Sequence, residues 1–246
     1  MKKVAQLMVL LNLFSLPTIV FAQTFQNLDF ESADVSTVVG YKQVQFANAF
    51  PGWSGSTQTP YFGFSSMASY NYAQMDDMFI GIFDQNSPYP SLDGYTAYLG
   101  GDLSTPYVNY GSADIWQTGV IPANAKSIQF YSTIAYEEAM PGYSPTLTLS
   151  LNGTPVSFSA IGTLGAFTQY AADVSAYAGT STTLKFDVSA TYPSPAPVSP
   201  NGHWIFGVGI DQISFSPTPA PEPAAITLLS LGLVFFIFNL SRKQAC

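Results

Sequence analysis

Cysteine and histidine are almost absent from this chain of 246 residues, in which Cys246 and His203 are the only ones. Because Cys246 is the last residue, no disulfide can cross-link the body of the chain, whose stability must come from packing or a bound metal ion. His203 is the only histidine that could serve in a Ser-His-Asp or Cys-His arrangement, and no activating residue lies beside it in the sequence. A single histidine also excludes a histidine-rich zinc site. We therefore expect a protein that is not an enzyme.

Positive charge is also scarce. Between residues 23 and 220 the only cations are Lys42, Lys126 and Lys185, against fourteen carboxylates, which gives a net charge of about −11. Such a surface argues against binding to nucleic acid or anionic lipid, and it is compatible with neutral glycans, Ca²⁺ or solubility alone. Charged residues make up 9% of the chain and aromatic residues 15%. The strong helix formers Lys and Glu are rare, which disfavours an α-rich fold.

The N-terminus has the features of a secretory signal peptide. Lys2 and Lys3 precede an apolar run, 4–21, and small or branched residues occupy the positions that a signal peptidase reads. We expect cleavage after Ala22, which leaves Gln23 as the first residue. A retained membrane helix is the alternative, but the run is short and is interrupted by polar and proline residues.

The C-terminal segment, 221–246, has three consecutive parts. An apolar run, 224–240, contains no charged residue, and its length of about 17 residues lies at the short end of what spans a bilayer as a helix. The flanking residues are Pro221, Glu222 and Pro223 in front, and Arg242 and Lys243 behind. The basic pair fits a cytoplasmic end, and the two prolines keep the segment in front of the helix extended.

This tripartite tail resembles the PEP-CTERM sorting signal. The resemblance implies that a membrane-embedded exosortase recognises Pro221, Glu222 and Pro223, removes the tail, and passes the body to the cell surface or extracellular matrix. It also implies signal peptidase and the general secretion machinery as partners, and a membrane-anchored precursor. The alternative is a single-pass membrane anchor preceded by a chance Pro-Glu-Pro.

The body, 23–216, is predicted to be all-β. Short segments of alternating apolar and polar residues are separated by turn residues, and the sequence contains about nine or ten of them. Asn152-Gly153 favours a two-residue type I′ turn in a hairpin over 146–158. The other predicted strands are 23–30, 35–46, 78–83, 95–99, 115–118, 127–135, 167–174, 182–188 and 207–215, the last with a bulge near Asp211. We expect a β-sandwich with jelly-roll topology, followed by a Pro/Thr linker, 217–220.

Several short motifs along the body together resemble the galactose-binding-like jelly rolls, a superfamily that includes many carbohydrate-binding modules. In chain order they are Asn27-Leu28-Asp29-Phe30-Glu31, Pro51-Gly52-Trp53, Asp93-Gly94-Tyr95, Trp116-Gln117, Leu149-Ser150-Leu151-Asn152-Gly153 and Gly209-Ile210-Asp211-Gln212-Ile213. The last motif departs from the usual Asp-Asp-Val or Asp-Asn-Val at Gln212.

The resemblance implies one structural Ca²⁺ that ties the N-terminal segment to the last strand. Glu31 and Asp211 match the positions of its ligands, and Asp29 is a possible helper. Carboxylate oxygens are what Ca²⁺ requires, and a body without cysteine gains stability from binding it. The alternative is that Asp29 and Glu31 cap the first turn while Asp211 shapes a bulge.

Aromatic side chains in the long, weakly periodic segments are candidate sugar platforms. They are Tyr61, Phe62, Tyr70, Tyr72, Tyr107, Tyr110 and Trp204. Trp53 and Trp116 are expected in the core. The sequence therefore predicts an exported, non-catalytic protein that binds extracellular polysaccharide. The alternatives are a structural surface protein without a specific ligand and a secreted glycan-active enzyme, for which Glu137-Glu138 and Asp76-Asp77 are the nearest carboxylate pair.

Overall fold

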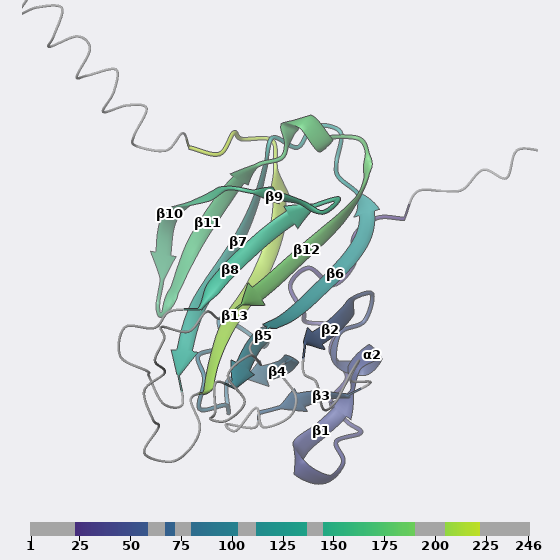
Figure 1. The fold of residues 1–246 in the computed structure, drawn as a ribbon, viewed down its shortest axis with the longest axis vertical. Coiled ribbons are helices and arrows are strands. Elements are labelled where there is room, and N and C mark those ends of the chain that lie inside the picture. Colours follow the sequence, from purple (N-terminus) through teal and green to yellow (C-terminus); the bar gives the residue numbers. More distant parts are fainter. Residues whose placement is uncertain are drawn as a thin grey trace, which may run out of the picture.

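The protein is a sandwich of two β-sheets that pack face to face (Figure 1). The computed structural model describes residues 23–58, 67–71, 80–102, 112–136, 145–189 and 205–221. The predicted signal peptide and most of the predicted sorting tail lie outside these residues. Within the described part, no helix has both the length and the apolar character to cross a bilayer. The all-β prediction for the body is confirmed.

The larger sheet has eight strands. In spatial order they are β1 (Gln43–Gln45), β3 (Met67–Tyr70), β4 (Ile80–Asp84), β5 (Tyr95–Asp102), β13 (Ile205–Ser216), β7 (Ser127–Tyr136), β11 (Phe167–Asp173) and β10 (Phe158–Leu164). Neighbouring strands are antiparallel except β3 and β4. The last strand of the chain, β13, lies in the middle of this sheet between β5 and β7, and its pairing with β7 shifts between Asp211 and Ser214. The bulge predicted near Asp211 is therefore present.

The smaller sheet has five strands, all antiparallel. In spatial order they are β2 (Ser54–Gln58), β6 (Ser112–Val120), β12 (Ser181–Ser189), β8 (Thr146–Leu151) and β9 (Thr154–Val156). Asn152 and Gly153 connect β8 to β9 with φ values of 50° and 78°. Positive φ at both positions is what a type I′ turn requires, so the predicted hairpin is confirmed.

The two strands predicted at the N-terminus are largely wrong. Residues 23–30 form turns, with only a bridge between Thr24 and Val120, and Phe30 has a positive φ of 59° that no strand allows. Of 35–46, only Gln43–Gln45 is a strand; the 3₁₀ turn η1 (Gly40–Lys42) precedes it and the one-turn helix α2 (Phe46–Ala49) follows. The chain curls here because burying Phe30, which is fully inaccessible, outweighs its local strand preference.

The core fills the space between the two sheets. Inward positions of β6 and β12 contribute Ile115, Leu184 and Phe186, which meet Ile128 and Phe130 of β7, and all five are fully buried. Burial of each such side chain contributes roughly 1.5–3 kcal/mol to the free energy of unfolding. Phe130 lies edge-on to Phe186 with ring centroids 5.1 Å apart, so rings from opposite sheets interlock at the centre.

The two expected core tryptophans differ. Trp53 is buried against Phe30, and its indole nitrogen donates a hydrogen bond to the carbonyl of Asn27 at 3.0 Å, as predicted for a core residue. Trp116 is half-buried on β6, between the fully buried Ile115 and the buried Gln117. Because side chains alternate along a strand, Trp116 points to the outer face of the five-stranded sheet, and the prediction that it lies in the core is wrong.

Candidate functional site

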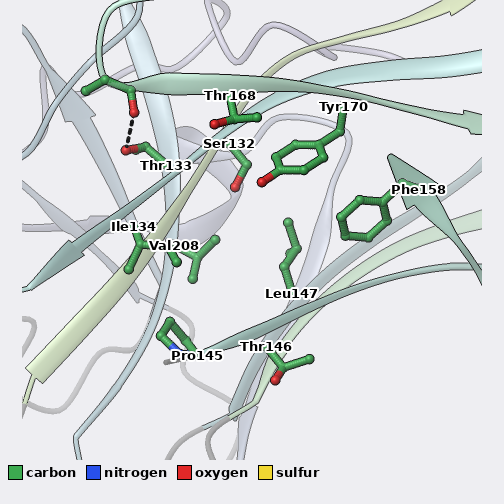
Figure 2. Close-up of a pocket in the computed structure, with 11 residues that line it drawn as sticks. Ser132, Thr133, Ile134, Pro145, Thr146, Leu147, Phe158, Thr168, Tyr170 and Val208 are labelled. Carbon is green, nitrogen blue, oxygen red and sulfur yellow. Dashed lines mark hydrogen bonds between the residues drawn. The ribbon is translucent and has the colours of Figure 1, made fainter. Parts of the chain in front are cut away.

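The sandwich is hollow at one end, where a pocket of about 500 Å³ opens between the sheets (Figure 2). Its walls come from β7, β10, β11 and β13 of the eight-stranded sheet and from the start of β8 in the other. Apolar side chains of Ile134, Leu147 and Val208 form part of the lining, and Pro145 lies at its edge.

The pocket follows from the inward sequence of β7. The successive inward residues are Ile128, Phe130, Ser132 and Ile134, so a small serine takes the position after the large central phenylalanine. On β11, Thr168 pairs with Ser132, so a second small side chain lies beside the serine and leaves space between the sheets at this level. Ile134, one step further out, is 44% exposed. The sheets are therefore held apart by the aromatic core, and side chains too small to meet leave space between them.

An aromatic wall closes the inner end of this pocket. Tyr170 and Phe158 lie edge-on to each other, with ring centroids 5.2 Å apart and an interplanar angle of 79°. Tyr170 also stacks on Phe130 at 5.6 Å. Because both rings are held by core contacts, they present a fixed surface to the cavity.

Hydroxyl groups supply the polar part of the lining. Among the described residues, the hydroxyls of Ser132, Thr146, Thr168 and Tyr170 have no hydrogen-bond partner, whereas Thr133 Oγ1 donates to the carbonyl of Ala166 at 2.8 Å (Figure 2). None of the described lining residues carries a charge. The pocket suits an uncharged ligand that has both an apolar face and hydrogen-bonding groups.

A second polar centre surrounds Asp211 in the bulge of β13. The side chain is fully buried; its Oδ2 accepts a hydrogen bond from Thr96 Oγ1 at 2.7 Å, and its Oδ1 accepts one from the Gln212 backbone N–H at 2.7 Å. Burial disfavours the charged form and raises the pKa of Asp211 to about 7, against an ordinary value of 3.8, although the Thr96 hydrogen bond opposes this shift.

Two more carboxylates lie beside Asp211. Glu31 Oε1 accepts a hydrogen bond from the Tyr95 backbone N–H at 2.7 Å, and Asp93 Oδ2 accepts one from Gln212 Nε2 at 2.6 Å. Burial, and the neighbouring Asp93 carboxylate, raise the pKa of Glu31. A Cβ at Gly94 would overlap the Glu31 carboxylate, so a larger residue there would require the Glu31 side chain to move away.

We tested whether this centre suits the predicted Ca²⁺. In the part of the chain that the structure describes, no three His, Cys, Asp or Glu side chains are arranged to hold a metal ion. However, Asp93 Oδ1 is a buried oxygen without a partner, next to two further carboxylates. Such an oxygen is costly to bury alone and is the type of ligand that Ca²⁺ prefers. The chemistry of this one oxygen fits the ion at Asp93, whereas Glu31 and Asp211 lie nearby without forming a three-ligand arrangement with it among the described residues.

The predicted helper Asp29 has a local role, because its Oδ1 accepts a hydrogen bond from the Glu31 backbone N–H at 3.3 Å. Asp93 was missed as a candidate ligand, since Asp93-Gly94 also has the form of an ordinary turn. Only the fold brings Asp93 within 2.6 Å of Gln212, which lies 119 residues further along the chain.

Of the predicted aromatic platforms, the structure describes Tyr70. Its hydroxyl donates to Asp84 Oδ2 at 2.7 Å, and Asn71 Nδ2 donates to Asp84 Oδ1 at 2.6 Å. Burial, and the neighbouring Asp84 carboxylate, raise the pKa of Tyr70 to about 12. Tyr61, Phe62, Tyr72, Tyr107, Tyr110 and Trp204 lie outside the described residues. So do Ala22, Glu222, Pro223, Arg242 and Lys243, while Gln23 and Pro221 are the first and last residues described.

No protein-family model and no curated protein matches this sequence. Two solved structures are similar in shape. One is TmCBM61 in complex with beta-1,4-galactotriose, with 13% identity over 79% of this chain and 99% of that chain and a TM-score of 0.38. The other is the enzymatically active domain of bacteriophage CBA120 tailspike protein 4, with 13% identity over 79% of this chain, 21% of that chain and a TM-score of 0.35. Neither likeness assigns a ligand or an activity to this chain.

Proposed function

We propose that this is an exported, non-catalytic protein whose β-sandwich has jelly-roll topology and binds carbohydrate, with the pocket between the sheets as its binding site. The observation that carries the proposal is the lining of that pocket: among the residues that the structure describes, fixed aromatic rings stand beside hydroxyls without a hydrogen-bond partner, and no lining side chain is charged.

A sugar ring has an apolar C–H face and an edge of hydroxyl groups. The Tyr170 ring and the side chains of Leu147 and Val208 offer surface to the apolar face, and the Ser132 and Thr168 hydroxyls can pair with the polar edge. The net charge of the body, about −11, disfavours an acidic polysaccharide. The preferred ligand class is therefore a neutral glycan.

Binding of the purified full chain to an array of neutral and acidic glycans tests this proposal. Tyr170→Phe removes one hydroxyl and should weaken binding to the best neutral glycan by about 2–10-fold, the effect of one net hydrogen bond. Thr146→Trp should obstruct the entrance and weaken binding more strongly, since Thr146 is exposed at the pocket mouth. Thr154→Trp, at an exposed position of β9, is the matched control. Equal affinities for the Thr146 and Thr154 variants would contradict the site.

We also propose the route by which the protein reaches its ligand. Signal peptidase cleaves after Ala22, and exosortase recognises Pro221, Glu222 and Pro223 and releases the body to the cell surface or matrix. The support is the order of box, apolar run and basic end in the sequence. Intact mass of the native protein is the test: loss of 1–22 and of the residues from about 221 onward is expected. A mass that retains 224–246 would point to a membrane-anchored ectodomain.

One structural Ca²⁺ held by Glu31, Asp93 and Asp211 completes the proposal. The bound ion would supply positive charge to a buried cluster of carboxylates and tie the N-terminal segment to β13 and to the turn before β5. Expected is a higher midpoint of thermal unfolding in Ca²⁺ than in EDTA for the unsubstituted chain, and no difference for Asp93→Asn. An unsubstituted chain that does not respond to Ca²⁺ would exclude the ion.

A further inference from the structure

The outer face of the five-stranded sheet carries a group of side chains that the pocket does not use. Trp116 of β6 lies there half-buried, beside Lys185 and Asp187 of β12. Among the described residues, the Trp116 indole contacts no other aromatic ring, and its N–H has no hydrogen-bond acceptor. Trp116 is therefore not part of the described core, and the uncovered part of its ring faces solvent on this side of the sheet.

The charged residues around Trp116 are held in place. Lys185 Nζ lies 2.8 Å from Asp114 Oδ2 and 3.8 Å from Asp187 Oδ2, and it stands 6.0 Å from the centroid of the Trp116 ring. Asp114 is almost fully buried, and its other oxygen accepts a hydrogen bond from Ser56 Oγ at 3.0 Å. These contacts fix the ammonium group next to the ring, so a ligand would not have to order either.

The strand register arranges these residues in two rows across the sheet. One row runs Ser54, Trp116, Lys185 and Ser150 across β2, β6, β12 and β8, and the next runs Ser56, Asp114, Asp187 and Thr148. Four adjacent strands span roughly 14 Å at the usual spacing. The result is a strip of hydroxyls and charges with one aromatic ring that crosses four strands, and its length suits an extended chain that lies across them.

The charges indicate which kind of chain would bind. One ammonium between two carboxylates leaves the strip with a net negative charge, which disfavours an anionic polymer. Neighbouring hydroxyls of a sugar can at the same time accept from Lys185 and donate to Asp187, and the apolar face of the ring can stack on Trp116.

We propose that this outer face is a second carbohydrate site, which binds an internal stretch of a neutral polysaccharide. It lies on the opposite side of the sheet from the pocket, because β8 turns Leu147 inward and Thr148 and Ser150 outward. With two sites on opposite faces, one molecule can bind two polysaccharide strands and cross-link them. The second site stands on its own residues; the cross-linking also rests on the proposed function of the pocket.

The test combines glycan binding with cross-linking, using the purified full chain and dextran, a β-1,3-glucan and mannan as neutral polymers, with alginate as the acidic comparison. Affinity electrophoresis measures binding, and light scattering of protein–polymer mixtures measures cross-linking. Trp116→Ala should weaken binding to the preferred neutral polymer about 10-fold or more at this site and abolish the scattering increase. Asp187→Asn keeps the shape of this half-buried side chain but removes its charge, and it should also weaken binding.

Tyr131→Ala is the matched control, since it removes a half-buried aromatic side chain from β7 in the other sheet. Unchanged binding and scattering in both the Trp116 and Asp187 variants would overturn the second site, whatever the pocket does. If Thr146→Trp and Trp116→Ala each abolish the scattering increase, cross-linking needs both sites, as proposed. If Thr146→Trp changes nothing, the outer face is a site but the pocket is not. No binding of the unsubstituted chain to any neutral polymer would overturn both.

Discussion

The outer faces of the two sheets both carry aromatic residues, but these residues are buried on one face and partly exposed on the other. On the eight-stranded sheet, Phe83 and Tyr98 are completely buried beneath Tyr89, with ring centroids 5.0–5.3 Å apart. On the five-stranded sheet, Trp116 is half-buried and the Lys185 ammonium lies 6.0 Å from the centroid of its ring. Both faces come from strands that alternate in the same way, so alternation by itself does not decide whether an outward aromatic residue is structural.

The difference comes from the segment that connects β4 to β5. It folds back over the eight-stranded sheet, where Tyr98 donates a hydrogen bond to the carbonyl of Pro90 at 2.6 Å and Thr96 Oγ1 accepts one from the Leu92 N–H at 3.2 Å. Tyr89, carried by this segment, then covers Phe83 and Tyr98. Outward aromatic residues thus form a small second core where a connecting segment of the chain covers them. Where no such segment covers the ring completely, part of it remains open to solvent.

The largest effect is expected on the covered face. Phe83→Ala should lower the free energy of unfolding by about 3–5 kcal/mol, because it removes a fully buried ring from a closed aromatic cluster. Urea unfolding followed by fluorescence measures this change. A loss below about 1 kcal/mol would mean that the cluster is not a core.

The next largest effect is expected at Asp211, also in the eight-stranded sheet, whose buried carboxyl should make the free energy of unfolding depend strongly on pH. The pKa of Asp211 is about 7 in the folded chain against 3.8 ordinarily, so between these values the folded state holds a proton that the unfolded chain releases. Without divalent cations, the free energy of unfolding should fall on the order of a few kcal/mol as pH rises from about 4 to about 7. Asp211→Asn should flatten this slope in chemical denaturation at a series of pH values. An equally steep slope in that variant would assign it to other groups.

A smaller effect is expected for the ion pair on the open face. Lys185→Met keeps the aliphatic stem but leaves the buried Asp114 carboxylate without its cation, which should cost about 1–2 kcal/mol of unfolding free energy. Lys126→Met, at an exposed position, is the control and should change stability by less than about 0.5 kcal/mol. Equal effects of the two substitutions would show that the pair does not stabilise the fold.

The smallest change in stability is expected for the open aromatic residue itself. Trp116→Ala should lower the free energy of unfolding by less than about 1 kcal/mol, since the ring lies on a solvent-facing surface rather than in a core. Thermal unfolding beside the Phe83→Ala chain gives the comparison directly. A loss as large as that of Phe83→Ala would mean that Trp116 is structural, and it would remove the reason for a site on this face.

The sequence predicted best those strands whose pairing is local or whose alternation is clean. The hairpin around Asn152 and Gly153, and the strands β7, β11, β12 and β13, occur where expected. The strands β2, β3 and β10 were missed, because segments with little periodicity become strands only when a neighbour offers its hydrogen bonds. The N-terminal strands were wrong because tertiary burial of Phe30 and Trp53 overrides local preference.

The candidate sites divide in the same way. Glu31 and Asp211 could be selected from sequence motifs, whereas Asp93 and Gln212 meet only across a bulge and a turn that lie far apart in the chain. The pocket could not be predicted, since it depends on Ser132 and Thr168 lying at one level of two paired strands.

The amino-acid sequence by itself determined that the body is a cysteine-free, acidic, all-β structure, because composition and alternation are local properties. Only the tertiary structure decided which aromatic residues are covered, where the sheets fail to meet, and which carboxylates lie together. Each of these depends on which strands become neighbours and how connections fold over them, and no window of the sequence contains both partners. The partial exposure of the Trp116 ring, for example, depends on which strands and segments lie beside β6.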